Sequence, residues 1–71
     1  MMDATIIRIE RERNTPNGNP VWRVFTDLGV YLTAPDYQVG SLISDEWAGR
    51  DVDMVLDGKG QITHLTHMRR A

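Results

Sequence analysis

Two histidines near the end of the chain have a spacing that is typical of metal ligands. His64 and His67 are three residues apart, and imidazole is a common ligand of zinc. On a β-strand, however, side chains three residues apart point to opposite faces, so the two rings do not bind one ion. The chain has no cysteine that could complete a site. We therefore expect no metal, and we expect His64 to be a half-buried packing residue.

Two carboxylates have a spacing that is compatible with acid–base chemistry. Asp51 and Asp53 flank Val52, which places both on one face of a strand, and paired carboxylates can share general acid–base work. Such side chains are usually solvated charges that form no pocket. The sequence also lacks a nucleophile elbow and a phosphate-binding glycine loop. We expect that the protein is not an enzyme and binds no cofactor. The alternative is a small hydrolase that uses either aspartate together with a histidine, but the sequence indicates no pocket for its substrate.

A third group of residues combines aromatic rings with guanidinium groups. On the predicted hairpin Phe25 is opposite Tyr31, and stacking aromatics beside arginine are how OB-like sheets hold single-stranded bases. The same rings could instead pack beneath the segment 37–47, or against a second subunit. Both interpretations stay open. The candidate binding face consists of Arg8, Arg23, Phe25, Tyr31 and Thr33.

Composition limits the classes of partner. The 71 residues have a formal net charge of -2 and a pI of about 5.5, which disfavours nucleic acid as a partner without excluding a local basic face. Glu10 and Glu12 alternate with the arginines of residues 8–13 and would weaken contacts with phosphates. No basic segment followed by an apolar run opens the chain, and no stretch approaches the roughly 20 apolar residues of a membrane span. We expect a cytoplasmic protein without a membrane partner.

Strands and turns must position these residues. Residues 4–13 predict a strand with Ile7 and Ile9 on one face and Arg8, Glu10 and Glu12 on the other, because the β-branched start and the turn formers of residues 14–20 disfavour a helix. Residues 21–34 predict a hairpin with a three-residue loop and a positive φ at Gly29. Its register pairs Thr26 with Val30, Val24 with Leu32 and Trp22 with Ala34. The inner face then holds Trp22, Val24, Val30 and Leu32.

A second hairpin is predicted around residues 57–60. Gly60 at the fourth turn position predicts another three-residue loop, which pairs Asp57 with Gln61 and Leu56 with Ile62. One face then holds Val52, Met54, Leu56, Ile62 and His64, and the other holds Asp53, Val55, Thr63 and Leu65. Between the hairpins, Ser44 could cap a short helix over residues 45–48 that ends at Gly49. The predicted core is Trp22, Val24, Leu32, Met54, Leu56 and Ile62.

These elements give five strands in a single domain of residues 1–71, which is too small for a sandwich. The sequence predicts a mainly β fold, a small five-stranded SH3-like or OB-like barrel with one short helix. A chain of this size without cysteine needs a well-packed barrel, a metal or self-association for stability. A homo-oligomer is therefore one expected form of partner.

The turn-rich segments carry a resemblance to a group of known proteins. The segments are Asn14–Pro20, Trp22–Val24, Thr26–Asp27, Tyr31–Asp36 and Leu56–Gly60. In them the chain resembles small uncharacterised proteins of actinobacterial phages, particularly mycobacteriophages. The resemblance covers most of residues 4–66 and brings no functional residues with it. It implies a product of the infected bacterial cytoplasm that acts by binding a host or phage protein.

The leading functional hypothesis is a non-enzymatic protein-interaction module that binds a host protein, a phage protein or itself. The absence of catalytic motifs and the small size of the chain support it. The alternative is a single-stranded nucleic-acid-binding small β-barrel that uses Arg8, Arg23, Phe25 and Tyr31. The two hypotheses differ in salt dependence, because affinity for nucleic acid falls steeply as salt rises.

Overall fold

Five strands and two short helical segments make up the described part of the chain. The structure is a computed structural model, and it describes residues 2–14 and 18–67. The elements are β1 (Met2–Asn14), β2 (Pro20–Thr26), β3 (Gly29–Leu32), α1 (Val39–Leu42), a 3-10 helix η1 (Asp45–Trp47), β4 (Asp51–Leu56) and β5 (Ile62–His67). The prediction of a small, mainly β fold with five strands is confirmed.

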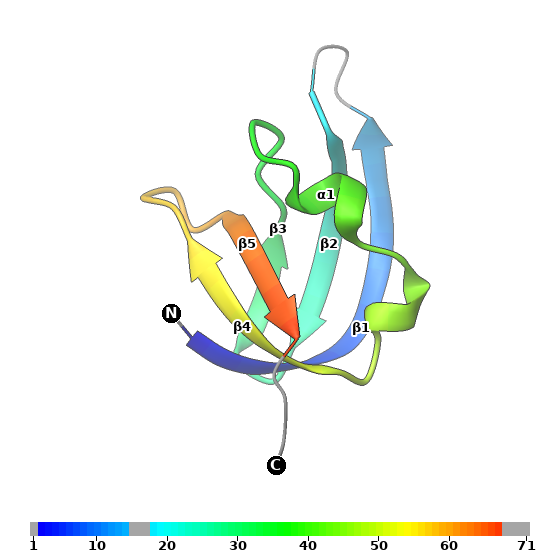
Figure 1. Ribbon diagram of the computed structural model, residues 1–71, viewed down its shortest axis with the longest axis vertical. Helices are drawn as coiled ribbons and strands as arrows, with labels where there is room; N and C mark the ends of the chain where they lie inside the picture. Colours follow the sequence, from blue (N-terminus) through cyan, green and yellow to red (C-terminus); the bar gives the residue numbers. More distant parts are fainter. Residues whose placement is uncertain (1, 15–17, 68–71) are drawn as a thin grey trace.

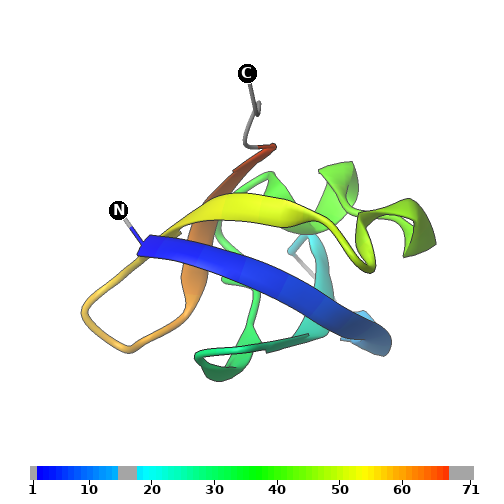
Figure 2. The ribbon, with the colours of Figure 1, turned by 90° about the horizontal axis from the view of Figure 1, so that it is seen from below.

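All five strands belong to one antiparallel sheet with the order β3-β2-β1-β4-β5. The long strand β1 lies in the middle, pairs with β4 through its first residues and with β2 through the rest, and curves strongly (Figure 1). The strands wrap around a common interior, as the view from below also shows (Figure 2). This curvature brings the two edges of the sheet toward each other.

The sheet curls without closing into a barrel within the described residues. Its edges meet at a single parallel bridge between Thr33 and Ile62, where the Ala34 N–H donates to the Ile62 carbonyl oxygen at 2.8 Å. Of the two predicted barrel types, the connectivity resembles the OB-like one. Strands β1 to β3 form a meander, a helical connection follows, and β4 of the last hairpin pairs with β1. That fold is a partly open five-stranded Greek-key arrangement.

A bulge in β1 changes which side chains face the core. Ile6 is opposite Thr26 and Arg8 is opposite Phe25, so Ile7 is an extra residue on β1. Ile7 is 64% exposed, whereas Ile9 packs against the core. The prediction that both isoleucines share one face is therefore wrong.

The core fills the inside of the curled sheet. Val24, Met54 and Ile62 are fully buried there as predicted, while Trp22 and Leu56 are partly buried against them. Leu32 is 36% exposed, so its predicted burial is wrong. The buried residues that form the cluster are Ala4, Ile6, Val24, Val39, Ile43, Val52, Met54 and Ile62.

The first hairpin has a shorter loop than predicted. Thr26 pairs with Gly29, which leaves Asp27 and Leu28 as a two-residue loop. Gly29 has the expected positive φ, at 141°. The one-residue change places Val24 opposite Tyr31, in place of Leu32, and it inverts the predicted faces of β3.

The second hairpin follows the predicted register only at its turn. Leu56 pairs with Ile62, the Asp57 N–H donates to the Gln61 carbonyl oxygen at 2.9 Å, and Gly60 has a φ of 76°. A bulge then follows, because His64 is opposite Val55. Beyond Thr63 the predicted faces are exchanged, so Leu65 packs against the core and His64 is exposed.

The helical segments lie between β3 and β4. The 3-10 helix η1 starts after Ser44 as predicted, but the Ser44 side chain makes no capping hydrogen bond. Gly49, at a φ of 84°, follows its end. The segment α1 was not predicted, and it is held by tertiary contacts: the Trp22 indole N–H donates to the Gly40 carbonyl oxygen at 2.7 Å, and Val39 is buried.

Candidate functional site

The predicted binding face is split between the two sides of the sheet. Arg8 is opposite Phe25, and Arg23 is two residues before Phe25 on β2, so these three residues share the outer side. Tyr31 is opposite Val24 and packs against the core. The predicted pairing of Phe25 with Tyr31 is therefore wrong.

Thr33 also lies inside, contrary to its predicted place on the binding face. Its side chain is fully buried, and its Oγ1 accepts a hydrogen bond of 2.9 Å from the Trp22 backbone N–H. The physical cause is the two-residue loop, because a shift of one residue turns each side chain of the strand to the other face. Thr33 connects β2 to the point where β3 meets β5.

The outer side of β1, β2 and β3 forms the surface that we call the β2–β3 face. It has two rows of residues that lie opposite one another across the strands. At the β3 edge the rows end in Val30, which is 54% exposed, and Leu32, which is 36% exposed. The six residues of the face are Arg8, Phe25 and Val30 in one row, and Glu10, Arg23 and Leu32 in the other.

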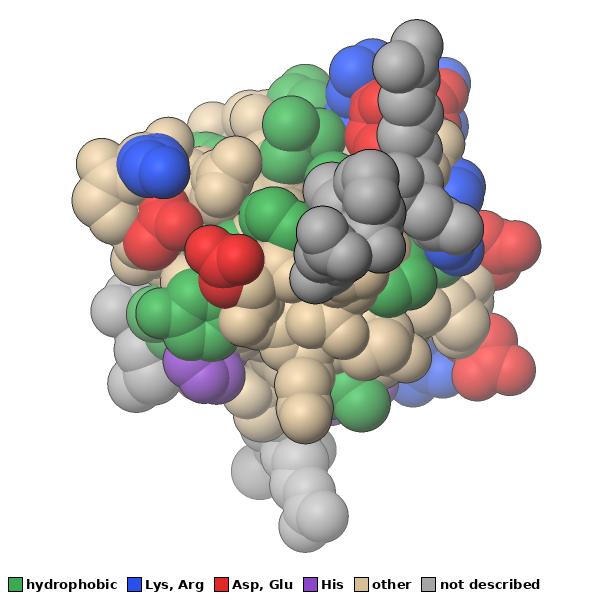
Figure 3. Space-filling view, turned by 90° about the horizontal axis from the view of Figure 1, so that it is seen from above, with side chains coloured by type: hydrophobic (Ala, Val, Ile, Leu, Met, Phe, Trp, Pro, Cys, Tyr) green, Lys and Arg blue, Asp and Glu red, His purple; other side chains and the backbone are tan. Residues whose placement is uncertain are grey.

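The positive charges of the β2–β3 face have partners within the chain. The Arg8 guanidinium lies 4.2 Å from the centre of the Phe25 ring and forms an ion pair of 3.3 Å with Glu10. Arg23 forms an ion pair with Glu12. On the side of the molecule shown in Figure 3, basic and acidic side chains likewise lie next to one another. The exposed apolar part of the β2–β3 face therefore lies along β3, beside charged side chains that are paired with one another.

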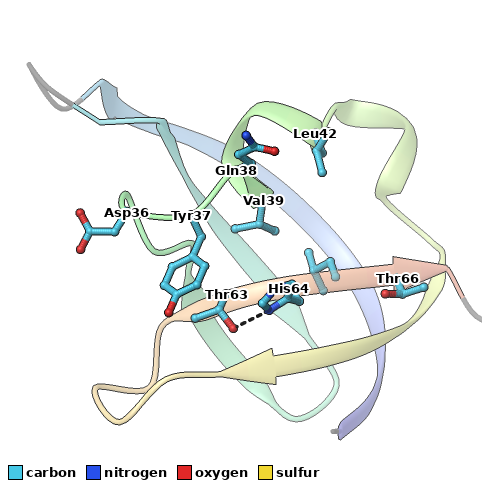
Figure 4. A pocket seen from close by; sticks show the side chains of 9 residues that line it. Asp36, Tyr37, Gln38, Val39, Leu42, Thr63, His64 and Thr66 are labelled. Atoms are coloured by element: carbon cyan, nitrogen blue, oxygen red, sulfur yellow. Dashed lines mark hydrogen bonds between the residues drawn. The ribbon is translucent and has the colours of Figure 1, made fainter.

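A second feature is a pocket of about 370 Å³ between the free edge of β5 and the segment that contains α1. We call it the β5 groove (Figure 4). The side chains of Tyr37 and Val39 point toward β5, and the ring of Tyr37 meets the ring of His64 edge-on, with centroids 5.7 Å apart. The residues that line the β5 groove are Asp36, Tyr37, Gln38, Val39, Leu42, Thr63, His64, Leu65 and Thr66.

The two histidines make separate contacts. His64 Nδ1 lies 3.0 Å from Thr63 Oγ1, on the groove side of β5. His67 stacks on Trp47, with ring centroids 3.9 Å apart. The part of the chain that the structure describes contains no group of three or more His, Cys, Asp or Glu side chains that could hold a metal ion.

Asp51 and Asp53 each contact a residue of β1. Asp51 accepts a hydrogen bond of 2.7 Å from the Thr5 hydroxyl, and Asp53 is opposite Asp3. A side-chain hydrogen bond with Asp3 and the charge of that neighbour raise the pKa of Asp53. Neither aspartate lines the β5 groove. The two carboxylates thus act within the β1–β4 pairing.

Comparison with protein-family models, with curated proteins and with solved structures gives no match. In residues 2–14 and 18–67, no helix is long and apolar enough to cross a membrane.

Sequence reasoning missed Val30, Leu32 and the β5 groove. The wrong register predicts both aliphatic residues on the inner face. The shorter loop depends on hydrogen bonds of the Thr26 hydroxyl, which the residue pattern does not display. The groove brings together residues 36–42 and 63–66, which are far apart in sequence. No local sequence pattern predicts a contact between segments so far apart.

Proposed function

We propose that the protein is a non-enzymatic protein-interaction module, an accessory protein that engages a protein partner through the β2–β3 face. The partner is a host or phage protein, or a second copy of this chain. The observation that carries the proposal is the exposure of Val30 and Leu32 beside Phe25 on an edge strand. Apolar residues that gather at a sheet edge rimmed by charges favour association with another protein.

The edge position of β3 adds to this argument. Within the described residues, β3 pairs with β2, and its other side meets β5 only at the end, through Thr33. Val30 and Leu32 alternate with Tyr31, so both aliphatic side chains are directed outward from the same short edge. A partner that covers this edge would remove both side chains from water, and the stabilisation would grow with the apolar area buried.

The second candidate function is single-stranded nucleic-acid binding. The OB-like strand order and the cation–π contact between Arg8 and Phe25 favour it, because such folds bind oligonucleotides on the face of strands 2 and 3. Against it, Arg8 covers the ring on which a base would stack, and Arg23 is paired with Glu12. The net charge of -2 also opposes a phosphate backbone.

A charge substitution on β3 tests the proposal. Val30→Glu should abolish association while leaving the melting temperature nearly unchanged, because Val30 faces solvent. Ala48→Glu, at another exposed position, is the matched control and should leave association intact. Sedimentation of the purified protein measures self-association. Cross-linking in the expressing cell measures binding to another protein.

The rival function predicts a different pattern. Nucleic-acid binding would give affinity for an oligothymidine that falls steeply with salt and is lost in Arg23→Glu. Val30→Glu would change it little. That pattern, together with unchanged protein association in Val30→Glu, would contradict the interaction module.

A further inference from the structure

We propose that the β5 groove binds an extended peptide segment of a partner protein, which adds as a strand to the free edge of β5 and directs a basic side chain to Asp36. This site is separate from the β2–β3 face, and the proposal does not depend on the function proposed for that face.

The first support is the free edge of β5. In the described part of the chain, β5 pairs with β4 on one side, and its other side is bridged only at Ile62, by Thr33. In an antiparallel pair, alternate residues direct their N–H and C=O groups away from the partner strand. Residues 63–67 therefore offer backbone donors and acceptors along an edge, which is the template for an added strand.

The second support is the shape of the groove. One wall consists of four consecutive β5 residues, Thr63 to Thr66, and the other consists of the segment 36–42 (Figure 4). A wall of consecutive strand residues matches an extended occupant better than a compact one, because main-chain hydrogen bonds then repeat along its length. The volume of about 370 Å³ lies within the range of about 300–1,000 Å³ that is typical of ligand pockets.

The third support is the chemistry of the walls. Tyr37 and Leu42 are 43% and 67% exposed, although large apolar side chains are usually buried, and both line the groove with the buried Val39. Alternate side chains of an added strand would pack on this apolar wall. Asp36 is the only carboxylate among the lining residues, and it lies on the segment beside Tyr37. A lysine or arginine of the peptide is its complement.

The experiment uses synthetic peptides of defined sequence. The probe is the blocked hexapeptide Lys-Val-Thr-Val-Thr-Lys, which carries a basic residue at both ends and so serves either strand direction. Binding to the isotope-labelled full chain is followed by amide chemical shifts. The expected shifts fall on residues 36–42 and 63–67. Absence of shifts there at millimolar peptide would overturn the proposal.

Two control peptides separate strand addition from unspecific contact. N-methylation of the four central amides removes the main-chain donors on both edges of the peptide and keeps the side chains, and it should weaken binding about tenfold or more. A version with glutamate at both ends should also bind more weakly to the wild type. Equal binding of the N-methylated peptide would exclude strand addition.

Variants of the protein locate the site. Leu42→Ser, at an exposed position, removes an apolar contact without adding a charge and should weaken binding, and Asp36→Lys should reverse the preference toward the glutamate-ended peptide. Val30→Glu should bind the probe as the wild type does. Loss of peptide binding in Val30→Glu with full retention in Leu42→Ser would overturn this proposal and leave the β2–β3 face as the site of binding.

Discussion

The Thr26 hydroxyl donates a hydrogen bond of 2.8 Å to the carbonyl oxygen of Gly29, the residue opposite it on β3. The Thr26 hydroxyl oxygen in turn accepts a hydrogen bond of 3.1 Å from the Leu28 backbone N–H. Both bonds close the two-residue loop and thereby set which side chains of β3 face the core. The exposure of Val30 and Leu32, and with it the proposed interface, depends on this threonine.

Thr26→Val should therefore destabilise the protein more than its small change in shape suggests. Thr26 is buried, and the substitution removes both bonds and leaves groups of the loop without their partner, at a cost of about 1–3 kcal/mol. Urea denaturation measures the loss. Thr66→Val, at an exposed position, is the control and should change stability little. Equal stability of the two variants would show that the hydroxyl does not set the loop.

Met54→Ala should be strongly destabilising because the Met54 side chain is fully buried in the core. Truncation of such a residue leaves a cavity and costs about 2–5 kcal/mol. Leu42→Ala, at a residue that is 67% exposed, serves as the comparison and should cost far less. Thermal unfolding followed by circular dichroism measures both. Similar melting temperatures for the two variants would be inconsistent with the core described above.

Gly40→Ala should destabilise the packing of α1 on β2. A Cβ atom at Gly40 would lie 1.7 Å from the Pro20 carbonyl oxygen, so the backbone of one segment must move. Overpacking of this kind costs about 1–3 kcal/mol or more. Gly58→Ala is the matched control, because a Cβ there meets no atom within 4 Å. A red shift of the tryptophan fluorescence should accompany the loss, since the Trp22 indole N–H donates to the Gly40 carbonyl oxygen. A fully stable Gly40→Ala would disprove the close approach.

Asp53→Asn should make the stability of the protein less dependent on pH. The hydrogen bond with Asp3 raises the pKa of Asp53 in the folded state, so the protonated form favours folding and this stabilisation is lost as the pH rises through the raised pKa. The substitution should therefore stabilise the protein at neutral pH, and the gain should shrink below the ordinary pKa of aspartate.

The partner of the pair supplies the control for that measurement. Asp3→Asn should have the same effect, because either substitution removes the contact between the two carboxylates across β1 and β4. The double variant should gain less than the sum of the two single variants. Strict additivity of the two gains at neutral pH would mean that the two groups do not interact.

The sequence predicted those features that a local residue imposes. Gly60 fixes the turn of the second hairpin through its positive φ, so the pairing of Leu56 with Ile62 was predicted correctly. The segment before Gly29 is compatible with loops of two and of three residues, and the choice depends on hydrogen bonds of Thr26 that the pattern does not display. That single residue of register separates the predicted faces from the observed ones.

Bulges and tertiary contacts account for the other differences. Ile7 and Thr63 are β-branched and each directly follows a β-branched residue, so alternation gives no sign that either is an extra residue in its strand. The residues of helix α1 show no local pattern that predicts a helix. The helix is stabilised by the packing of Val39 in the core against strands that are distant in sequence. The candidate sites differ in the same way. Arg8, Arg23 and Phe25 share a face as predicted, because neighbouring strands place them there. The β5 groove could not be predicted, because it forms only when the curled sheet brings residues 36–42 beside β5.

The position of β1 between β2 and β4 also bears on the order of folding. The pairs of β1 with β2, and of β2 with β3, join segments that are close in sequence, whereas Met2 pairs with Met54. During synthesis, the first part of β1 has no partner until β4 has left the ribosome. The three-stranded meander can therefore form early, and closure of the long loop to β4 should limit the folding rate, because the chain entropy is lost before those contacts compensate for it. Substitutions such as Val52→Ala in β4 would then slow folding, and equivalent changes in β3 would slow it too, because the contacts of the meander are already formed in the rate-limiting step.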